Sequence, residues 1–242
     1  MFSKCVEFIT PGTGRCQQNE LRWGLRTLKY AKAFTHRTSN YCLSTRRFPK
    51  CGRCSGAIYS QYNIENLLSL SREDDIVGPF VVNDVSGGSE EMWSLLGRLH
   101  LPYIAMHTRG TPKNMQNLTD YDNVTEAVRE FFEGIAAEAD RHGVKDWILD
   151  PGFGFAKTVE QNWQLLREMS VLQEFDKDIL VGLSRKSFLF RPLGITPADA
   201  LPATQVADFI ALQNGADILR VHDVAEAVRT IKLYRLFNGV NN

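Results

Sequence analysis

The chain has 242 residues, of which 43% are hydrophobic and 23% charged, and its formal net charge is zero. This length and composition allow one sizeable core, and the interspersed charges, without a basic stripe, favour neither a nucleic-acid partner nor an anionic-membrane partner. No apolar run approaches the roughly 20 residues of a membrane span, and the N-terminus lacks the basic and apolar regions of a signal peptide, so we expect a cytoplasmic protein.

The first 78 residues contain one clear element and no repeating pattern. Residues 19–34 have helical spacing, with Leu21, Leu25 and Leu28 on one face. The stretch THRTSNYCLSTRRFPKCGRCSG that follows is basic, rich in cysteine and without period, and a compact domain rarely carries a loop of that length. We therefore expect an atypical N-terminal segment over 1–78 and a regular body over 79–242.

All five cysteines lie in the first 54 residues, and two of them form the spacing Cys51-Gly-Arg-Cys54. Such a pair is half of a zinc site or a redox pair. A tetrahedral zinc site needs two further ligands, and only Cys42 and His36 lie near it in the sequence. Reduced thiols are therefore the simpler interpretation.

From residue 79 onward, short apolar runs rich in β-branched residues alternate with longer stretches of helical period. The runs are 80–83, 103–107, 147–150, 179–184 and 218–222, and the helical stretches are 90–98, 122–142, 160–170, 198–213 and 223–236. Repeated strand and helix units predict an α/β protein, either a doubly wound sheet or a closed (β/α)8 barrel.

Each predicted strand ends in a hydrogen-bonding or ionisable residue. In a (β/α)8 barrel of the TIM type, the carboxyl ends of the strands meet on one face, where catalytic side chains lie. We therefore predict this barrel, with one set of side chains gathered around a ligand: Asn83, His107, Asp150, Ser184, Lys186, Arg220 and His222. Any single Asn, Asp or Ser in this set is equally well explained as the N-cap of the next helix.

The stretch LDPGFGFAKT, residues 149–158, presents Asp150 at the exit of a strand. Pro151 cannot continue the strand, and Gly152 and Gly154 let the loop bring its backbone close to a ligand. The glycine and lysine spacing matches neither a dinucleotide fingerprint nor a P-loop. A partly buried carboxylate binds a flat donor fork well, which suggests a pterin or guanine ring.

Cations follow the later strands. Arg220 and His222 alternate along one strand, so both side chains point the same way and can hold an anion such as a phosphate. Residues 184–187, SRKS, place a hydroxyl and two cations at a turn whose free backbone donors also favour anions. Taken singly, each basic residue is more simply explained as a solvated surface charge.

Five motifs follow one another along the chain: VVNDVSGG, MHTRGTP, LDPGFGFAKT, LVGLSRKS and ILRVHDV. In this order and at these intervals they closely resemble the dihydropteroate synthase family of folate biosynthesis, over about residues 79–236. The resemblance implies a transferase that joins 6-hydroxymethyl-7,8-dihydropterin diphosphate to p-aminobenzoate, giving 7,8-dihydropteroate and diphosphate. It also implies magnesium as the metal and a homodimer.

The resemblance assigns roles by motif position. The implied contacts of the pterin ring are Asn83, Met106, Asp150 and Lys186. The implied contacts of the aminobenzoate are Phe155 and Ser184, and those of the departing diphosphate are Arg220 and His222. The candidate catalytic residues are Lys186, Arg220 and His222, because preorganised cations stabilise the charge that develops on diphosphate.

The family's opening motifs are not intact in this chain. Its Asn-Val-Thr-Pro-Asp-Ser-Phe loop, which carries the asparagine associated with magnesium, has no match, so the metal ligand is unknown. Thr10-Pro11-Gly12 resembles a remnant of the second loop, and Ala156 stands where the family usually has glycine. We expect a barrel that is incomplete at its N-terminus. A reading-frame disturbance near RRFPKC is one hypothesis, and the gene's nucleotides would test it.

Three functions remain open from the sequence. The first is an active dihydropteroate synthase, and the second is a non-catalytic pterin-binding remnant that keeps Asp150 and Asn83 without turnover. A pterin-dependent methyltransferase is the weakest alternative, because the motifs SRKS and RVHDV favour the synthase.

Overall fold

A computed structural model of the chain describes residues 7–9, 40–43, 56–60, 80–110 and 114–239. Within these ranges eight strands form one sheet: β1 (Glu7–Ile9), β2 (Asn40–Leu43), β3 (Gly56–Ser60), β4 (Phe80–Asp84), β5 (Tyr103–Met106), β6 (Trp147–Asp150), β7 (Leu180–Val181) and β8 (Ile218–Val221). Their order is β6-β5-β4-β3-β2-β1-β8-β7, and a bridge between Leu149 and Ile179 joins the two outermost strands. The described strands therefore close into a barrel.

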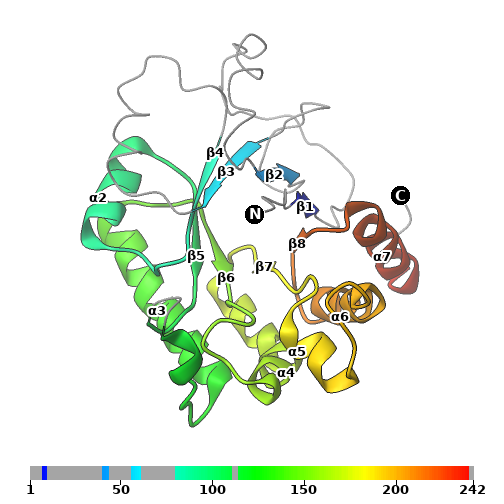
Figure 1. Ribbon diagram of the computed structural model, residues 1–242. Coiled ribbons are helices and arrows are strands. Elements are labelled where there is room, and N and C mark those ends of the chain that lie inside the picture. The colour runs from blue at the N-terminus through cyan, green and yellow to red at the C-terminus, as the bar shows by residue number, and fades with distance from the viewer. Residues whose placement is uncertain (1–6, 10–39, 44–55, 61–79, 111–113, 240–242) are drawn as a thin grey trace.

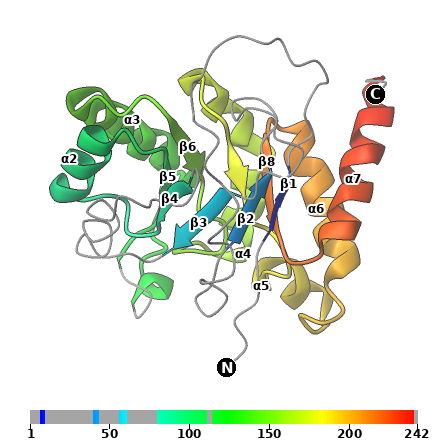
Figure 2. The ribbon, with the colours of Figure 1, turned by 90° about the horizontal axis from the view of Figure 1, so that it is seen from above.

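The helices follow the strands around the outside of this barrel. They are α2 (Glu90–Leu99), α3 (Val124–His142), α4 (Val159–Glu168), α5 (Ser187–Phe190), α6 (Leu201–Gln213) and α7 (Val224–Phe237), with short 3-10 turns η1 (Met115–Asn117), η2 (Met169–Phe175) and η3 (Arg191–Leu193). Figure 1 shows them in succession around the strands, and Figure 2 shows the strands between α2 and α3 on one side and α6 and α7 on the other. The predicted α/β barrel is confirmed, and the five predicted helices of the body all occur within a few residues of their expected bounds.

The strands of the body run in one direction, whereas the first two strands run the opposite way. β3, β4, β5, β6, β7 and β8 pair in parallel around the barrel. β1 pairs in parallel with β2 but antiparallel with β8, where Glu7 lies opposite Val221. β2 is likewise antiparallel to β3. The sequence predicts a barrel that is incomplete at its N-terminus, but eight described strands are present, and the difference lies in the reversed direction of the first two.

Side chains alternate along each strand, so one set points into the barrel and the other points outward toward the helices. Each set forms its own apolar core. One layer of residues packs inside the barrel: Val81, Ile104, Ile148, Leu180 and Ile218. The intervening residues, among them Val82, Ala105, Leu149 and Leu219, pack outward against the helices. Because side chains alternate along a strand, the residues two positions after the inner layer point into the same interior.

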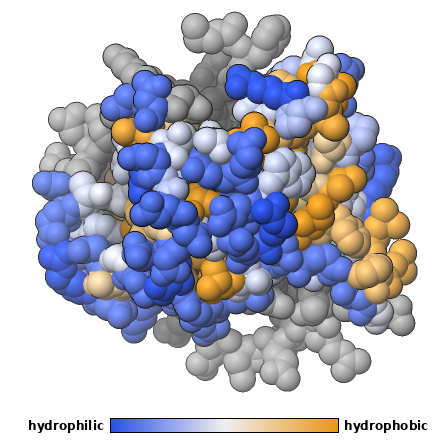
Figure 3. Space-filling view, turned by 90° about the horizontal axis from the view of Figure 1, so that it is seen from below, coloured by the Kyte–Doolittle hydropathy of each residue, from blue (hydrophilic) through white to orange (hydrophobic). Residues whose placement is uncertain are grey.

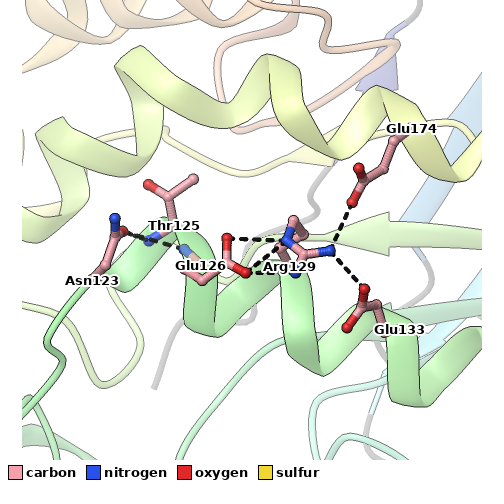
Figure 4. Close-up of polar contacts among 6 residues, drawn as sticks. All are labelled: Asn123, Thr125, Glu126, Arg129, Glu133 and Glu174. Atoms are coloured by element: carbon pink, nitrogen blue, oxygen red, sulfur yellow. Dashed lines mark hydrogen bonds and ion pairs between the residues drawn. The ribbon is translucent and has the colours of Figure 1, made fainter.

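Local capping fixes the helices that flank the barrel. Figure 4 shows Asn123, whose side chain accepts hydrogen bonds from the backbone at the start of α3. One turn later Arg129 binds Glu126 and Glu133 of the same helix and Glu174 of η2. Exposed ion pairs of this kind add little stability, but they fix the contact between α3 and η2.

Two predictions for the N-terminal segment concern residues outside the described ranges. These are the helix over 19–34 and the possible metal or redox role of Cys51 and Cys54, and the boundary at residue 78 also stays a prediction. Among the described residues, no helix combines the length and apolar character that crossing a membrane requires.

Candidate functional site

A polar layer lies above the apolar layer inside the barrel, at the carboxyl ends of β4, β5, β6, β7 and β8, which we call the barrel mouth. Asn83, Met106 and Asp150 each lie two residues after a member of the inner apolar layer, and all three are buried. The register supports this arrangement, because Met106 lies opposite Asp150 across β5 and β6. Asn83 and Asp150, two of the polar strand-end residues predicted from the sequence, therefore meet at this mouth.

Asp150 is held from two sides. Its Oδ1 accepts a hydrogen bond from the Gly152 backbone N–H at 2.9 Å, and its Oδ2 lies 2.7 Å from Arg220 Nη2 as an ion pair. Gly182 makes room for the guanidinium, since a Cβ at this position would lie 2.9 Å from the Nε of Arg220. Although it is this close to Arg220, Oδ2 has no hydrogen-bond partner of acceptable geometry among the described residues. It therefore keeps the capacity to accept one from a ligand.

Asn83 adds a second buried acceptor to the barrel mouth. Its Oδ1 has no hydrogen-bond partner within the part of the chain that the structure describes. A buried polar atom without a partner costs free energy, and such atoms are often explained by a bound ligand or water. Asn83 and Asp150 together fit a flat ligand edge that carries several N–H donors.

The carboxyl ends of β7 and β8 bring a hydroxyl to an imidazole. Ser184 Oγ lies 3.0 Å from Nδ1 of His222 and also accepts the His222 backbone N–H at 3.3 Å. Ser184 is buried, whereas His222 is exposed at the rim. This contact shows that the ends of β7 and β8 are neighbours. The side chains of Arg220 and His222 point to the same side of the strand, as predicted.

Lys186 reaches across the barrel mouth to the loop that follows β6. Its Nζ donates a hydrogen bond to the backbone carbonyl of Phe153 and lies 4.9 Å from the centroid of the Phe155 ring. Burial, followed by the charge of Arg220, lowers the pKa of Lys186 to about 7, against the opposing effect of Asp150. The ammonium group is therefore close to the balance between its two protonation states at neutral pH.

The loop of residues 152–157, which we call the glycine loop, is fixed by side chains. Asn162 of α4 accepts the Gly154 N–H at 2.6 Å through Oδ1 and donates to the Lys157 carbonyl. Thr158 and Gln161 form a capping box that begins α4 directly after the loop. The glycines are required here, because Gly152 has φ +68° and a Cβ on it would lie 1.9 Å from the His107 carbonyl oxygen.

The structure corrects the prediction for His107. Met106 and His107 are consecutive, and Met106 belongs to the inner side of β5, so His107 turns outward. Its ring packs edge-on against Phe131 of α3, and Nδ1 lies 2.9 Å from Lys157 Nζ. Burial, followed by the charge of Lys157, lowers the pKa of His107 to about 2, so the ring is neutral. It supports the glycine loop and does not face the barrel interior.

A second correction concerns Arg185, one of the two cations of the SRKS motif. Its guanidinium binds both carboxylate oxygens of Asp223, at 2.8 and 2.9 Å, and its Nη1 donates to the carbonyls of Pro197 and Ala198. All of these partners are far away in sequence, so the motif alone gives no sign of them. Arg185 thus joins neighbouring loops, and Lys186 is the cation of this motif that enters the barrel mouth.

The carboxylates at the described strand ends do not form a magnesium site. Mg²⁺ prefers oxygen ligands, but Asp150 is engaged as described above, and Asp84 accepts from Tyr103 Oη and the Gly88 N–H. The described strand ends bring together no group of three His, Cys, Asp or Glu ligands. One group of three potential ligands does occur in the described ranges, Glu90, Glu138 and His142, but it lies on α2 and α3, and both carboxylates pair with Arg141.

Comparison with known proteins places this geometry in a family. Residues 73–222 match the family model described as pterin binding enzyme. The chain is 41% identical over 169 residues to the dihydropteroate synthase of Synechocystis sp. and 35% identical over 165 residues to that of Escherichia coli. These alignments cover 68% and 67% of this chain, and in both cases the chain spans 58% of the relative's length.

Solved structures show the same relationship at the level of the fold. The crystal structure of dihydropteroate synthase from Thermus thermophilus is 30% identical, with a TM-score of 0.70 over 76% of this chain and 73% of that one. The same enzyme has been solved in complex with 4-aminobenzoate, with a TM-score of 0.70 over 76% of this chain and 75% of that one. Its structure in complex with 6HMPPP gives a TM-score of 0.69 over 76% and 73%. Both complexes are 30% identical to this chain.

Proposed function

The chain belongs to the pterin binding enzyme family, and from that premise we propose that it is a dihydropteroate synthase, a transferase of folate biosynthesis. It would condense 6-hydroxymethyl-7,8-dihydropterin diphosphate with p-aminobenzoate to give 7,8-dihydropteroate and diphosphate. Activity and substrates are proposed because the chain spans 58% of the length of the curated relatives that it matches.

The observation that carries the proposal is the ion pair of Asp150 and Arg220 at 2.7 Å inside the barrel. A buried carboxylate suited to the donor edge of a pterin lies directly beside a cation suited to a diphosphate. The substrate carries both groups in one small molecule. Asn83 Oδ1 and Asp150 Oδ2 accept no hydrogen bond among the described residues, and they lie on the same side as Met106, which would line the ring.

The reaction is a substitution at carbon. The lone pair of the aminobenzoate nitrogen forms a bond to the pterin methylene carbon, while the bond from that carbon to the diphosphate oxygen breaks and diphosphate leaves. The nitrogen then loses a proton to solvent. Arg220, His222 and Lys186 would stabilise the charge gathering on the leaving oxygens, and Phe155 and Ser184 would orient the aminobenzoate ring.

Magnesium remains a proposal that rests on the family resemblance alone. No step of the mechanism is assigned to a metal. Comparing turnover in magnesium with turnover in a chelator would test the requirement.

We further propose that the protein is a homodimer. α6 and α7 carry large apolar side chains that are 60 to 70% exposed: Val206, Leu233, Leu236 and Phe237, which we call the α6–α7 patch. Figure 3 shows apolar side chains gathered on the side of the molecule that carries these helices. Contiguous exposed apolar surface is typical of protein interfaces. The cytoplasmic location expected from the sequence also stays a proposal.

The function is tested by supplying the purified protein with pterin diphosphate, p-aminobenzoate and magnesium, and measuring both diphosphate and dihydropteroate. We expect release that falls at least about a hundredfold in Asp150→Ala and in Lys186→Ala. Asp140→Ala and Lys145→Ala, which remove exposed residues of the same charge, are the matched controls. Release that survives both site substitutions would contradict the proposal.

The alternative is a pterin-binding chain without turnover. The reversed direction of β1 and β2 favours it, because these strands occupy the part of the barrel where the family's opening loops are expected. Binding of pterin diphosphate that depends on Asp150, measured by calorimetry, together with no diphosphate release, would support this alternative.

A further inference from the structure

Lys157 is a buried lysine whose amino group has three acceptors within hydrogen-bond distance. The residue is only 5% exposed. Its Nζ atom lies 2.9 Å from His107 Nδ1, 3.0 Å from the Gly152 carbonyl oxygen and 3.2 Å from the Phe155 carbonyl oxygen. Burial, followed by the charge of Lys186, lowers the pKa of Lys157 to about 7, against the opposing effect of Asp150. In its protonated form the group has three donors and no acceptor, so these three acceptors satisfy it completely.

One of the three acceptors of Lys157 is a neutral imidazole. When Lys157 is protonated it donates to Nδ1 of His107, which leaves the single proton of the neutral ring on Nε2. The low pKa of His107 agrees with this state. His107 is therefore a fixed acceptor at the end of β5, and through it Lys157 ties the glycine loop to the neighbouring strand.

The other two acceptors belong to the glycine loop itself. The carbonyls of Gly152 and Phe155 are turned toward one ammonium group, while Asn162 holds the Gly154 N–H. The Phe155 ring lies next to the Lys186 ammonium at the barrel mouth. The position of the Phe155 ring is thus set by hydrogen bonds to the backbone of Phe155 and to the backbone of the neighbouring glycines in the loop.

We propose that Lys157 is a positioning residue for the aminobenzoate: it locks the glycine loop against His107 and so presents the Phe155 ring to the incoming substrate. This proposal deepens the proposed synthase function and rests on it. Lys157 does not itself contact the reacting atoms, because each hydrogen of its ammonium group is committed to the protein. Lys186, whose Nζ reaches the barrel mouth, has the separate role of contacting the substrates.

The main test is Lys157→Met, which keeps the length of the side chain and removes its three donors. Lys145→Met, an exposed lysine before β6, is the matched control. We expect the KM for aminobenzoate to rise at least about tenfold, while the Kd for pterin diphosphate stays within about twofold of the unaltered protein. Equal losses for both ligands, or a fall in kcat alone, would overturn the positioning role.

A second readout needs no substrate. Hydrogen exchange of the backbone amides of residues 152–157 should accelerate at least about tenfold in Lys157→Met, with peptides of α3 unchanged. Unchanged exchange in the loop would refute the proposal even if the chain has no synthase activity. Conversely, faster exchange in a chain that never releases diphosphate would leave the locking of the loop intact and reject only the synthase function.

His107→Phe provides a milder variant in case Lys157→Met does not fold. It removes one of the three acceptors and keeps an aromatic ring beside Phe131. We expect the same selective rise in the KM for aminobenzoate, smaller than that of Lys157→Met, and a double variant no worse than Lys157→Met alone. Fully additive effects would show that the two residues act separately and would overturn the proposed lock.

Discussion

Asp208 offers the sharpest test of the electrostatics of this barrel. It lies on α6 and is only 2% exposed, and its Oδ1 has no hydrogen-bond partner among the described residues. Burial, together with the nearby charge of Asp223, raises the pKa of Asp208 to about 7 from the ordinary 3.8. The folded protein therefore holds a proton that the unfolded chain releases between about pH 4 and pH 7.

The sign of the effect follows from this difference in proton binding. Stability falls as the pH rises through this window, because the folded state is the one that binds the extra proton. Above about pH 8 the raised pKa of Asp208 lowers the free energy of unfolding by about 4 kcal/mol. At pH 5 it lowers the free energy of unfolding by only about 2 kcal/mol. Asp208→Asn removes the charge, so its advantage over the unaltered protein should grow by about 2 to 3 kcal/mol from pH 5 to pH 8.

Urea unfolding at the two pH values measures this quantity. A buried amide in place of the carboxyl adds its own cost, but that cost is the same at both pH values and cancels in the comparison. Asp140→Asn, an exposed aspartate of α3, controls for the loss of a carboxylate. If the stability curves of Asp208→Asn and the unaltered protein run parallel from pH 5 to pH 8, the raised pKa of Asp208 is wrong.

Three further substitutions test the loop and the surface. Gly152→Ala places a methyl group 1.9 Å from the His107 carbonyl oxygen at a positive φ, and we expect a loss of about 2 to 5 kcal/mol in urea unfolding; a loss below about 1 kcal/mol would contradict the geometry. Ala156 is buried at φ +48°, so Ala156→Gly relieves strain but removes a buried methyl group. Its unfolding free energy should stay within about 1 kcal/mol of the unaltered protein, and a larger change would show that one effect dominates. Phe237→Asp should convert a dimer to a monomer in light scattering, and an unchanged mass would exclude the α6–α7 patch as the interface.

Local pattern was enough to predict much of the fold. β6 coincides with its predicted range, and the predicted strand over 103–107 differs from β5 by one residue. These elements are specified by the spacing of their hydrophobic residues and by the residues that end them, and both are local properties of the sequence. The direction of β1 and β2 depends on pairing with strands far away in the chain, and no local pattern encodes it.

The candidate site was predicted in outline, and its errors have physical causes. The period of two along a strand shows that Met106 and His107 cannot both face the barrel interior, so the outward turn of His107 could have been recognised. The engagement of Arg185 could not, because its partner Asp223 lies 38 residues away. Lys157 has no motif that distinguishes a loop anchor from a ligand cation, and its role follows only from the three acceptors around it.

The reversed strands change which parts of the chain can reach a ligand. A strand that runs with the rest of the barrel has its carboxyl end beside Asp150, whereas the carboxyl ends of β1 and β2, at Ile9 and Leu43, lie at the opposite rim. The amino ends of β1 and β2, at Glu7 and Asn40, therefore lie on the side of the barrel mouth. A ligand-binding group added to this part of the chain should accordingly replace a residue next to Glu7 or Asn40, whereas a group placed at Ile9 or Leu43 would lie at the far end of the barrel.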